Sequence, residues 1–242
     1  MRDTAPYGTD FFATQQTQSR LAAEKMLRLV FDRYPAKSVV DLGCGVGTWS
    51  AASLALGSQQ ARGIDGDWVP RNALQIPASS FSTSDLEASL PPPELHDLAI
   101  CVEVLEHLTD AAGERAVEWL CKSARVVVFS AAIPEQGGTH HINEQWQSYW
   151  ADRFSKFGYQ CFDLIRPYFW TDTTIPFWYR QNILVYSRLS DFGNPAKCVD
   201  VVHPELYENL IRRVTRRRKR SLGFKLKSAL ARTGVVARPS SI

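Results

Sequence analysis

The sequence predicts an α/β protein whose core is a doubly wound, mostly parallel β-sheet. Short apolar runs that suit buried strands alternate along the chain with segments of helical periodicity. A glycine-rich turn directly follows the first of these runs and leads into a helical segment. The length of 242 residues and the hydrophobic content of 45% suit one domain with a short appendage. We therefore predict a main domain over residues 1–200 and a tail over 201–242.

The elements follow from hydrophobic spacing and from helix and turn signals. Ser19 is expected to cap the first helix, and Pro35 ends it. The predicted helices are residues 19–34, 48–56, 111–124 and 144–157. The predicted strands are residues 38–42, 61–65, a weaker one ending near Asp85, then 97–103, 125–130, 159–164 and 182–186.

Composition excludes several classes of protein. The aromatic content of 11% is too high for a disordered chain, and every apolar run is much shorter than the ~20 residues of a membrane span. No apolar segment follows Met1, so we expect no secretory signal and a cytoplasmic location. The five cysteines are widely spaced and form no CxxC pair, which argues against a disulfide framework: Cys44, Cys101, Cys121, Cys161 and Cys198.

The turn DLGCGVG, residues 41–47, predicts a ligand site. Gly43, Gly45 and Gly47 lack a Cβ atom where the backbone would approach a ligand. The third glycine comes one position earlier than in the dinucleotide fingerprint GxGxxG, which disfavours a pyrophosphate ligand. Asp65 ends the next strand, where a carboxylate can accept both hydroxyl hydrogens of a ribose. The alternatives are a plain tight turn and a capping aspartate.

These segments resemble the class I S-adenosylmethionine-dependent methyltransferases. The resemblance rests on VVDLGCGVG, on GID at residues 63–65, on Asp85-Leu86, and on HDLAICVEVLEHL at 96–108, and it covers residues 38–187. It implies a seven-stranded Rossmann-like sheet with the methyl donor across the carboxyl ends of the strands. The donor-binding residues that it implies are Asp41, Gly43, Cys44, Gly45, Gly47, Asp65, Gly66, Asp85, Leu86 and Glu103.

A second group of polar residues follows the strand at 97–103. If a helix began there, Glu103, Glu106 and His107 would share one side of it. Two carboxylates and an imidazole suit Mg²⁺, Mn²⁺ or Zn²⁺, and His141 fits as a fourth ligand better than His140. Without a metal, His107 or His141 could act as the base that deprotonates a hydroxyl, or these groups could merely order the loop.

The ExxEH segment is similar to that of small-RNA 2′-O-methyltransferases and of ubiquinone-pathway O-methyltransferases. We expect O-methylation of a small-molecule or saccharide hydroxyl. An RNA 2′-O-methyltransferase is the alternative enzyme, although residues 1–200 carry a net charge of −6, which would repel phosphates. A non-catalytic, donor-binding scaffold is the third possibility.

Two further segments carry aromatic and basic residues. Six aromatics between positions 168 and 179 suggest a cover or an aromatic wall for the acceptor, with Arg166 or Arg180 available for an acidic group. Residues 7–12 could close the same site. The tail carries a net charge of +9 and a helical apolar rhythm. It could be a solvated extension, a peripheral anchor on an anionic membrane or, less favoured, a nucleic-acid contact.

Overall fold

The computed structural model describes the backbone of residues 9–196 and 200–216, and the side chains from Ser19 onward within those ranges. The chain divides into two compact units, Met1–His203 and Pro204–Ile242. Within the second unit, residues 204–216 form a helix. Cys198, residues 7 and 8 of the N-terminal arm and the tail beyond residue 216 lie outside the described residues, as do the side chains of residues 9–12.

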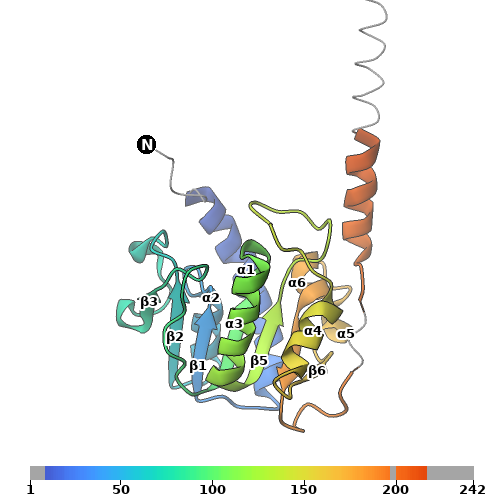
Figure 1. Cartoon of the computed structure of the whole chain (residues 1–242). Coiled ribbons are helices and arrows are strands. Elements are labelled where there is room, and N and C mark those ends of the chain that lie inside the picture. Colours follow the sequence, from blue (N-terminus) through green and yellow to red (C-terminus); the bar gives the residue numbers. More distant parts are fainter. Residues whose placement is uncertain (1–8, 197–199, 217–242) are drawn as a thin grey trace, which may run out of the picture. The chain divides into compact units, whose positions relative to one another are not determined.

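A seven-stranded, mostly parallel sheet forms the centre of the first unit and confirms the predicted fold (Figure 1). The strand order is β3-β2-β1-β4-β5-β7-β6. Only β7 runs antiparallel to its neighbours β5 and β6 among the pairings of the sheet. The strands are β1 (Ser38–Leu42), β2 (Gln60–Asp65), β3 (Phe81–Thr83), β4 (His96–Val102), β5 (Ala124–Ser130), β6 (Gln160–Phe162) and β7 (Leu184–Ser187).

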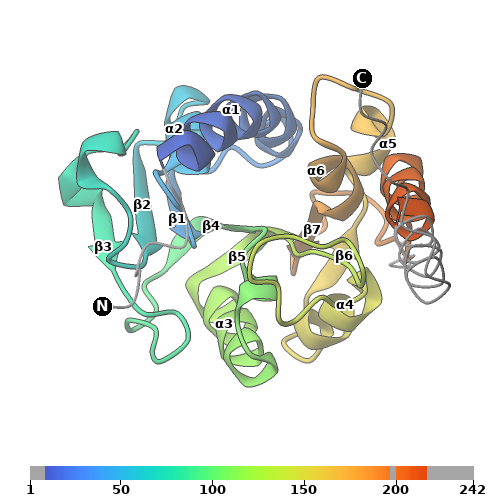
Figure 2. The same ribbon diagram turned by 90° about the horizontal axis from the view of Figure 1, so that it is seen from above.

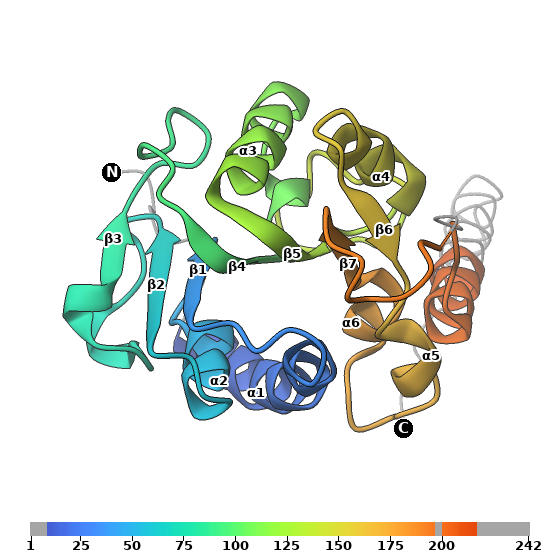
Figure 3. The same ribbon diagram turned by 90° about the horizontal axis from the view of Figure 1, so that it is seen from below.

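Helices cover both faces of this sheet. Helices α1, α2 and α6 lie on one face and α3 and α4 on the other (Figures 2 and 3). The helices are α1 (Thr9–Phe31), α2 (Thr48–Ala55), α3 (Asp110–Ser123), α4 (Gln147–Ser155), α5 (Arg166–Phe169) and α6 (Phe177–Asn182), with short 3₁₀ turns η1 (Arg71–Ala73), η2 (Ala78–Ser80) and η3 (Leu105–His107).

The central strands are buried on both faces, which explains their unbroken apolar runs. In β5, Val126 and Val128 pack into the cluster with α1 and α2, whereas Val127 and Phe129 pack into the cluster with α3 and α4. This alternation is the two-residue period of a strand. Since both faces need apolar side chains, the strand reads as a continuous apolar segment rather than an alternating one.

Several predicted element boundaries were wrong. The first helix begins at Thr9, so Ser19 lies inside it, and its buried hydroxyl is hydrogen-bonded to that of Tyr179 at 2.7 Å. Asn182 ends helix α6 instead of starting a strand. No α-helix begins at Glu103, whose φ of 55° is left-handed, and only the short turn η3 follows it. The predicted helical spacing therefore does not apply at that point.

The sheet order reverses between β1 and β4, which pair in parallel through Val39–Leu98, Val40–Ala99 and Asp41–Ile100. Crevices for ligands open outside the carboxyl ends of strands at such a reversal. The glycine turn follows β1, and the Glu103–His107 segment follows β4. The two predicted groups of functional residues thus belong to the same edge of the sheet.

None of the helices among the described residues has the length and apolar character needed to cross a bilayer.

Candidate functional site at the carboxyl edge of the sheet

The glycine turn leaves β1 through three residues with positive φ. Gly43, Gly45 and Gly47 have φ values of 75°, 55° and 82°. A Cβ atom at Gly43 would lie 2.4 Å from Cγ2 of Val104, so the turns after β1 and β4 pack directly on each other. A Cβ atom at Gly45 would meet no described atom within 4 Å. The turn therefore presents bare backbone to open space at Gly45, as a ligand cradle requires.

Asp65 at the end of β2 holds this turn. Its carboxylate accepts hydrogen bonds from the backbone N–H of Gly45 and of Gly66, both at 2.6 Å. Burial raises the pKa of Asp65, and the two N–H donors oppose that increase. Cys44 is buried beside Gly63, where a Cβ atom would lie 2.6 Å from Sγ. These contacts fix the path of the turn relative to β2.

Asp41 is a buried acid beneath the turn, with 2% of its surface exposed. Its carboxylate accepts a hydrogen bond from the hydroxyl of Ser50 in α2 at 2.8 Å. Burial raises the pKa of Asp41 to about 7, and the nearby charge of Asp65 adds to the increase. Ser50 was not predicted as a site residue. The one feature of the sequence that could have indicated it is its position in the helix of small residues that follows the glycine turn.

The residues after β3 make a turn of their own. Asp85 is exposed, and its Oδ1 accepts hydrogen bonds from the backbone N–H of Glu87 at 3.0 Å and of Ala88 at 3.3 Å. Leu86 is buried in the cluster that contains Val104. Asp85 thus remains accessible to a ligand, whereas Leu86 connects this turn to the core.

Glu103 is held by two side-chain amides. Its Oε1 accepts from Nδ2 of Asn182 at 3.0 Å, and its Oε2 accepts from Nε2 of Gln136 at 3.2 Å. Burial raises the pKa of Glu103, and these hydrogen bonds oppose the increase. Gln136 also accepts from Asn182 and from Gln181, which extends the amide network. Sequence reasoning missed these amides because they come from distant segments.

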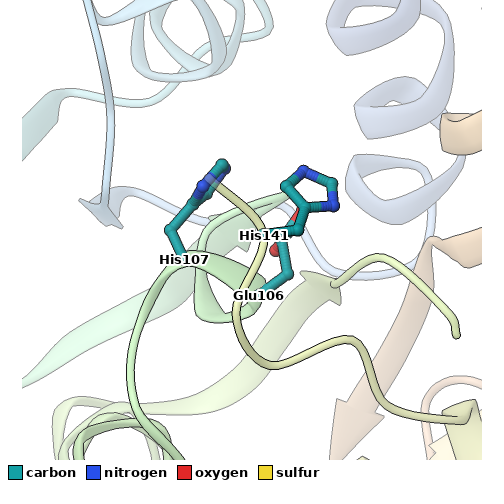
Figure 4. A group of neighbouring side chains, drawn as sticks. All are labelled: Glu106, His107 and His141. Carbon is teal, nitrogen blue, oxygen red and sulfur yellow. The ribbon is translucent and has the colours of Figure 1, made fainter. Parts of the chain in front are cut away.

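Glu106, His107 and His141 converge on one point (Figure 4). One potential ligand atom from each lies within 4.8 Å of the others. The three residues come from η3 and from the loop after β5. The structure thus brings together three of the four predicted metal ligands, while Glu103 is bonded to the amides instead.

Neither oxygen of the buried Glu106 carboxylate makes a hydrogen bond of ordinary geometry with the described residues, although the backbone N–H groups of Glu106 and Ala132 and the carboxyl group of Glu103 approach it. Burial raises its pKa well above the ordinary value, and the charge of Glu103 raises it further. Buried polar groups are normally satisfied, so this carboxylate calls for a proton or a cation that stabilises it.

Each histidine is oriented through one ring nitrogen. Nδ1 of His107 lies 3.3 Å from the carbonyl oxygen of His140, and Nδ1 of His141 lies 2.9 Å from Oε1 of Glu144. Burial lowers the pKa of His107 to about 4, and the charge of His141 adds to this effect. His107 is therefore neutral near pH 7, as a metal ligand or an acceptor of protons must be. The side chain of His140 is exposed, and its backbone has a left-handed φ of 59°. Its contribution to this group is its backbone carbonyl oxygen.

The two arginines of the aromatic segment do not reach out for an acidic ligand. Arg166 is buried and bonds Oδ1 of Asp163 through Nε at 2.9 Å. Arg180 donates to the carbonyl oxygens of Ile175 at 2.8 Å and Trp170 at 2.7 Å. The expectation that either one holds an acceptor's acidic group was wrong, because both fasten the segment between β6 and β7.

The sequence of this chain matches a known family and a curated relative. Residues 14–175 match the family described as a methyltransferase domain. The ubiquinone biosynthesis O-methyltransferase of Stutzerimonas stutzeri (strain A1501) is 34% identical over 104 residues, which are 39% of this chain and 44% of that protein. The chain therefore spans less than half of the length of this relative.

Two solved structures share the fold. The magnesium protoporphyrin IX methyltransferase of Synechocystis PCC 6803, solved with bound SAH, has a TM-score of 0.54 at 19% identity, over 76% of this chain and 90% of that one. An O-methyltransferase family protein from Burkholderia thailandensis has a TM-score of 0.54 at 14% identity, over 74% of this chain and 58% of that one. Because both sequence identities are low, these two structural similarities show the fold alone.

Proposed function

This chain belongs to the methyltransferase-domain family and is a class I S-adenosylmethionine-dependent methyltransferase, and on that premise we propose that it methylates a hydroxyl oxygen of a small molecule or saccharide. The observation that carries the proposal is the convergence of Glu106, His107 and His141 after β4, at the edge of the sheet where the glycine turn follows the neighbouring strand β1. The curated relative with an O-methyltransferase name supports the choice of oxygen. An oxygen acceptor must lose a proton during transfer, and this cluster can take part in its removal.

The residues at the edge of the sheet fit the donor. Gly45 leaves backbone open to a ligand, and Asp65 ends the neighbouring strand with a carboxylate suited to ribose hydroxyls. We assign Asp41 or Glu103 to the donor's amino acid end and Asp85 to the adenine side. We also assign Gly43, Cys44, Gly47, Gly66 and Leu86 to the donor site, because they form the turns after β1, β2 and β3 at this edge of the sheet. S-adenosylmethionine, when bound, supplies an electrophilic methyl group on a sulfonium ion, while these residues orient it.

We further propose that Glu106, His107 and His141 hold one divalent cation, Mg²⁺, Mn²⁺ or Zn²⁺. The residues fit such an ion because the buried Glu106 carboxylate makes no hydrogen bond of ordinary geometry with the described residues and lies close to both imidazoles. Both histidines are anchored through Nδ1, which leaves Nε2 for coordination and matches the usual support of metal-bound imidazoles. The ion would lower the pKa of the acceptor's hydroxyl. In a metal-free mechanism, Nε2 of His141 or His107 would accept that proton.

Charge favours a small acceptor over RNA. Residues 1–200, which contain the whole sheet, carry a net charge of −6. Such a body repels a phosphate backbone, whereas a neutral hydroxyl compound is unaffected. Transfer to a terminal 2′-hydroxyl of RNA is the alternative outcome of the test below.

Labelled S-adenosylmethionine, offered with panels of phenols, saccharides and short RNA, tests this function. We expect transfer to a hydroxyl compound, and transfer to RNA alone would contradict the choice of acceptor. Donor binding without transfer to any member of the panels would favour a scaffold role. In parallel, EDTA should stop transfer until a divalent ion is restored, and full activity in EDTA with no metal by elemental analysis would exclude the cation. Glu106→Gln should remove metal binding while donor affinity stays.

A further inference from the structure

The helix formed by residues 204–216 is drawn in orange-red in Figure 1. Its exposed side chains include an apolar stripe. Tyr207, Ile211 and Val214 follow one another at spacings of four and three residues, so they share one face of the helix. They are 61%, 48% and 47% exposed. Apolar side chains that line up on a surface helix mark an interaction surface more often than scattered ones do.

Basic residues occupy the other side of this helix. At 100° per residue, Arg212, Arg213 and Arg216 point away from the apolar stripe. Arg212 forms an ion pair with Glu208 at 3.2 Å, one turn earlier. The sequence continues with four basic residues at 217–220, and residues 201–242 carry a net charge of +9. A narrow apolar stripe and dense positive charge thus occur in one short segment.

We propose that this helix binds the surface of an anionic lipid bilayer. Tyr207, Ile211 and Val214 would enter the boundary between headgroups and acyl chains, while the arginines contact lipid phosphates. Helices that lie in the interface combine a strongly polar, cationic face with an apolar face in this way. Basic residues near an anionic surface each strengthen binding to it, so the net charge of +9 in residues 201–242 complements such a surface.

The apolar stripe favours lipid over nucleic acid. Nucleic acid would engage the arginines but would leave Ile211 and Val214 exposed to water. Residues 1–200 carry a net charge of −6, so an anionic membrane attracts the tail and repels the rest of the chain. Binding is then confined to the tail, and the methyltransferase domain stays in the aqueous phase near the membrane.

Sedimentation of the full-length chain with vesicles tests the proposal. Vesicles of phosphatidylcholine alone are compared with vesicles that also contain phosphatidylglycerol, at low and high salt. We expect binding only with phosphatidylglycerol, and weaker binding at high salt because the charges are screened. A single-stranded RNA probe is titrated in parallel.

Matched variants separate the apolar stripe from charge. Ile211→Asn should weaken vesicle binding by about tenfold or more, because it removes an apolar side chain that would enter the bilayer and leaves the charge unchanged. Asn209→Ser, half-buried on the side of the helix opposite the stripe, is the control and should bind like the parent. Arg213→Gln should weaken binding by about fivefold. Unchanged donor affinity verifies that each variant is folded.

Three results would overturn the proposal. The first is no sedimentation with phosphatidylglycerol vesicles, and the second is equal binding to both kinds of vesicle. The third is RNA binding that Ile211→Asn leaves intact while vesicle binding is absent. None of these results bears on methyl transfer, which is measured separately.

Discussion

The carboxylate of Glu103 accepts a hydrogen bond from the side-chain amide of Asn182, at 3.0 Å, across 79 positions of sequence. Glu103 directly follows β4, and Asn182 is the last residue of α6. Asn182 also donates to Oε1 of Gln136 at 3.0 Å. The segment between β6 and β7 is thereby bonded to the edge of the sheet where we propose that the donor binds.

Asn182→Ala should lower the stability of the chain and its affinity for the donor together. Removing the amide leaves the buried Glu103 carboxylate with one donor fewer, which costs about 1–3 kcal/mol. Urea unfolding measures the free energy of unfolding, and calorimetry measures S-adenosylmethionine binding. Gln60→Ala, at an exposed amide on β2, serves as the control. Unchanged donor affinity in Asn182→Ala would show that Glu103 does not contribute to donor binding.

Gly45→Asp should abolish donor binding. Its Cβ atom would project into the open space in front of the turn, and the new carboxylate would lie near Asp65, which already bonds Gly45 N–H. Gly158→Asp is a matched control, because Gly158 also has positive φ, 78°, and open space around a Cβ atom, but lies in the turn before β6. Both variants should lose roughly 1–2 kcal/mol of stability from backbone strain. Equal donor affinity in the two would contradict the assignment.

Asp41 should make the ligand-free chain less stable as pH rises from about 4 to 7. Its folded-state pKa is about 7 and its ordinary value 3.8, so in this range the folded chain keeps a proton that the unfolded chain releases. Stability therefore falls with rising pH, by at most about 1.4 kcal/mol per pH unit for one group. The full effect is reached above pH 7 and vanishes below pH 4.

Asp41→Asn isolates this effect, because an amide oxygen can still accept the hydrogen bond from Ser50. We expect the variant to exceed the parent in unfolding free energy above pH 7 and to match it near pH 4, by urea unfolding at a series of pH values. Glu103 and Glu106 titrate in both proteins, so the difference between the two curves reports Asp41. A constant difference at every pH would contradict the raised pKa.

Glu144→Gln should slow methyl transfer by roughly 10–100-fold and leave donor affinity unchanged, because Glu144 orients the ring of His141 through Nδ1. Steady-state kinetics should show the loss in kcat, and the pH dependence of kcat should shift. Glu135→Gln, an exposed acid in the same loop, controls for the loss of charge. If Glu144→Gln only lowered stability, with kcat and pH profile intact, His141 would have no role in proton removal.

The sequence by itself determined the fold class, the succession of the main strands along the chain and the position of the glycine turn. Those features are local, since the Asp41–Gly47 segment and the apolar run of β4 contain the signals that specify them. The resemblance added the family, which the match over residues 14–175 confirms. The donor-binding and metal-ligating residues remain predictions.

Only the tertiary structure decided which polar groups meet. Glu106 and His141 are separated by a helix and a strand, so their approach depends on how β4 and β5 pair and on the course of the loop that follows. The hydrogen bond between Glu103 and Asn182 likewise depends on how distant segments pack. The left-handed φ of Glu103 is incompatible with the α-helix that the sequence spacing suggested at this position. Hydrophobic periodicity carries information on burial but none on long-range hydrogen bonds between amides and carboxylates. Packing of distant segments fixes those contacts.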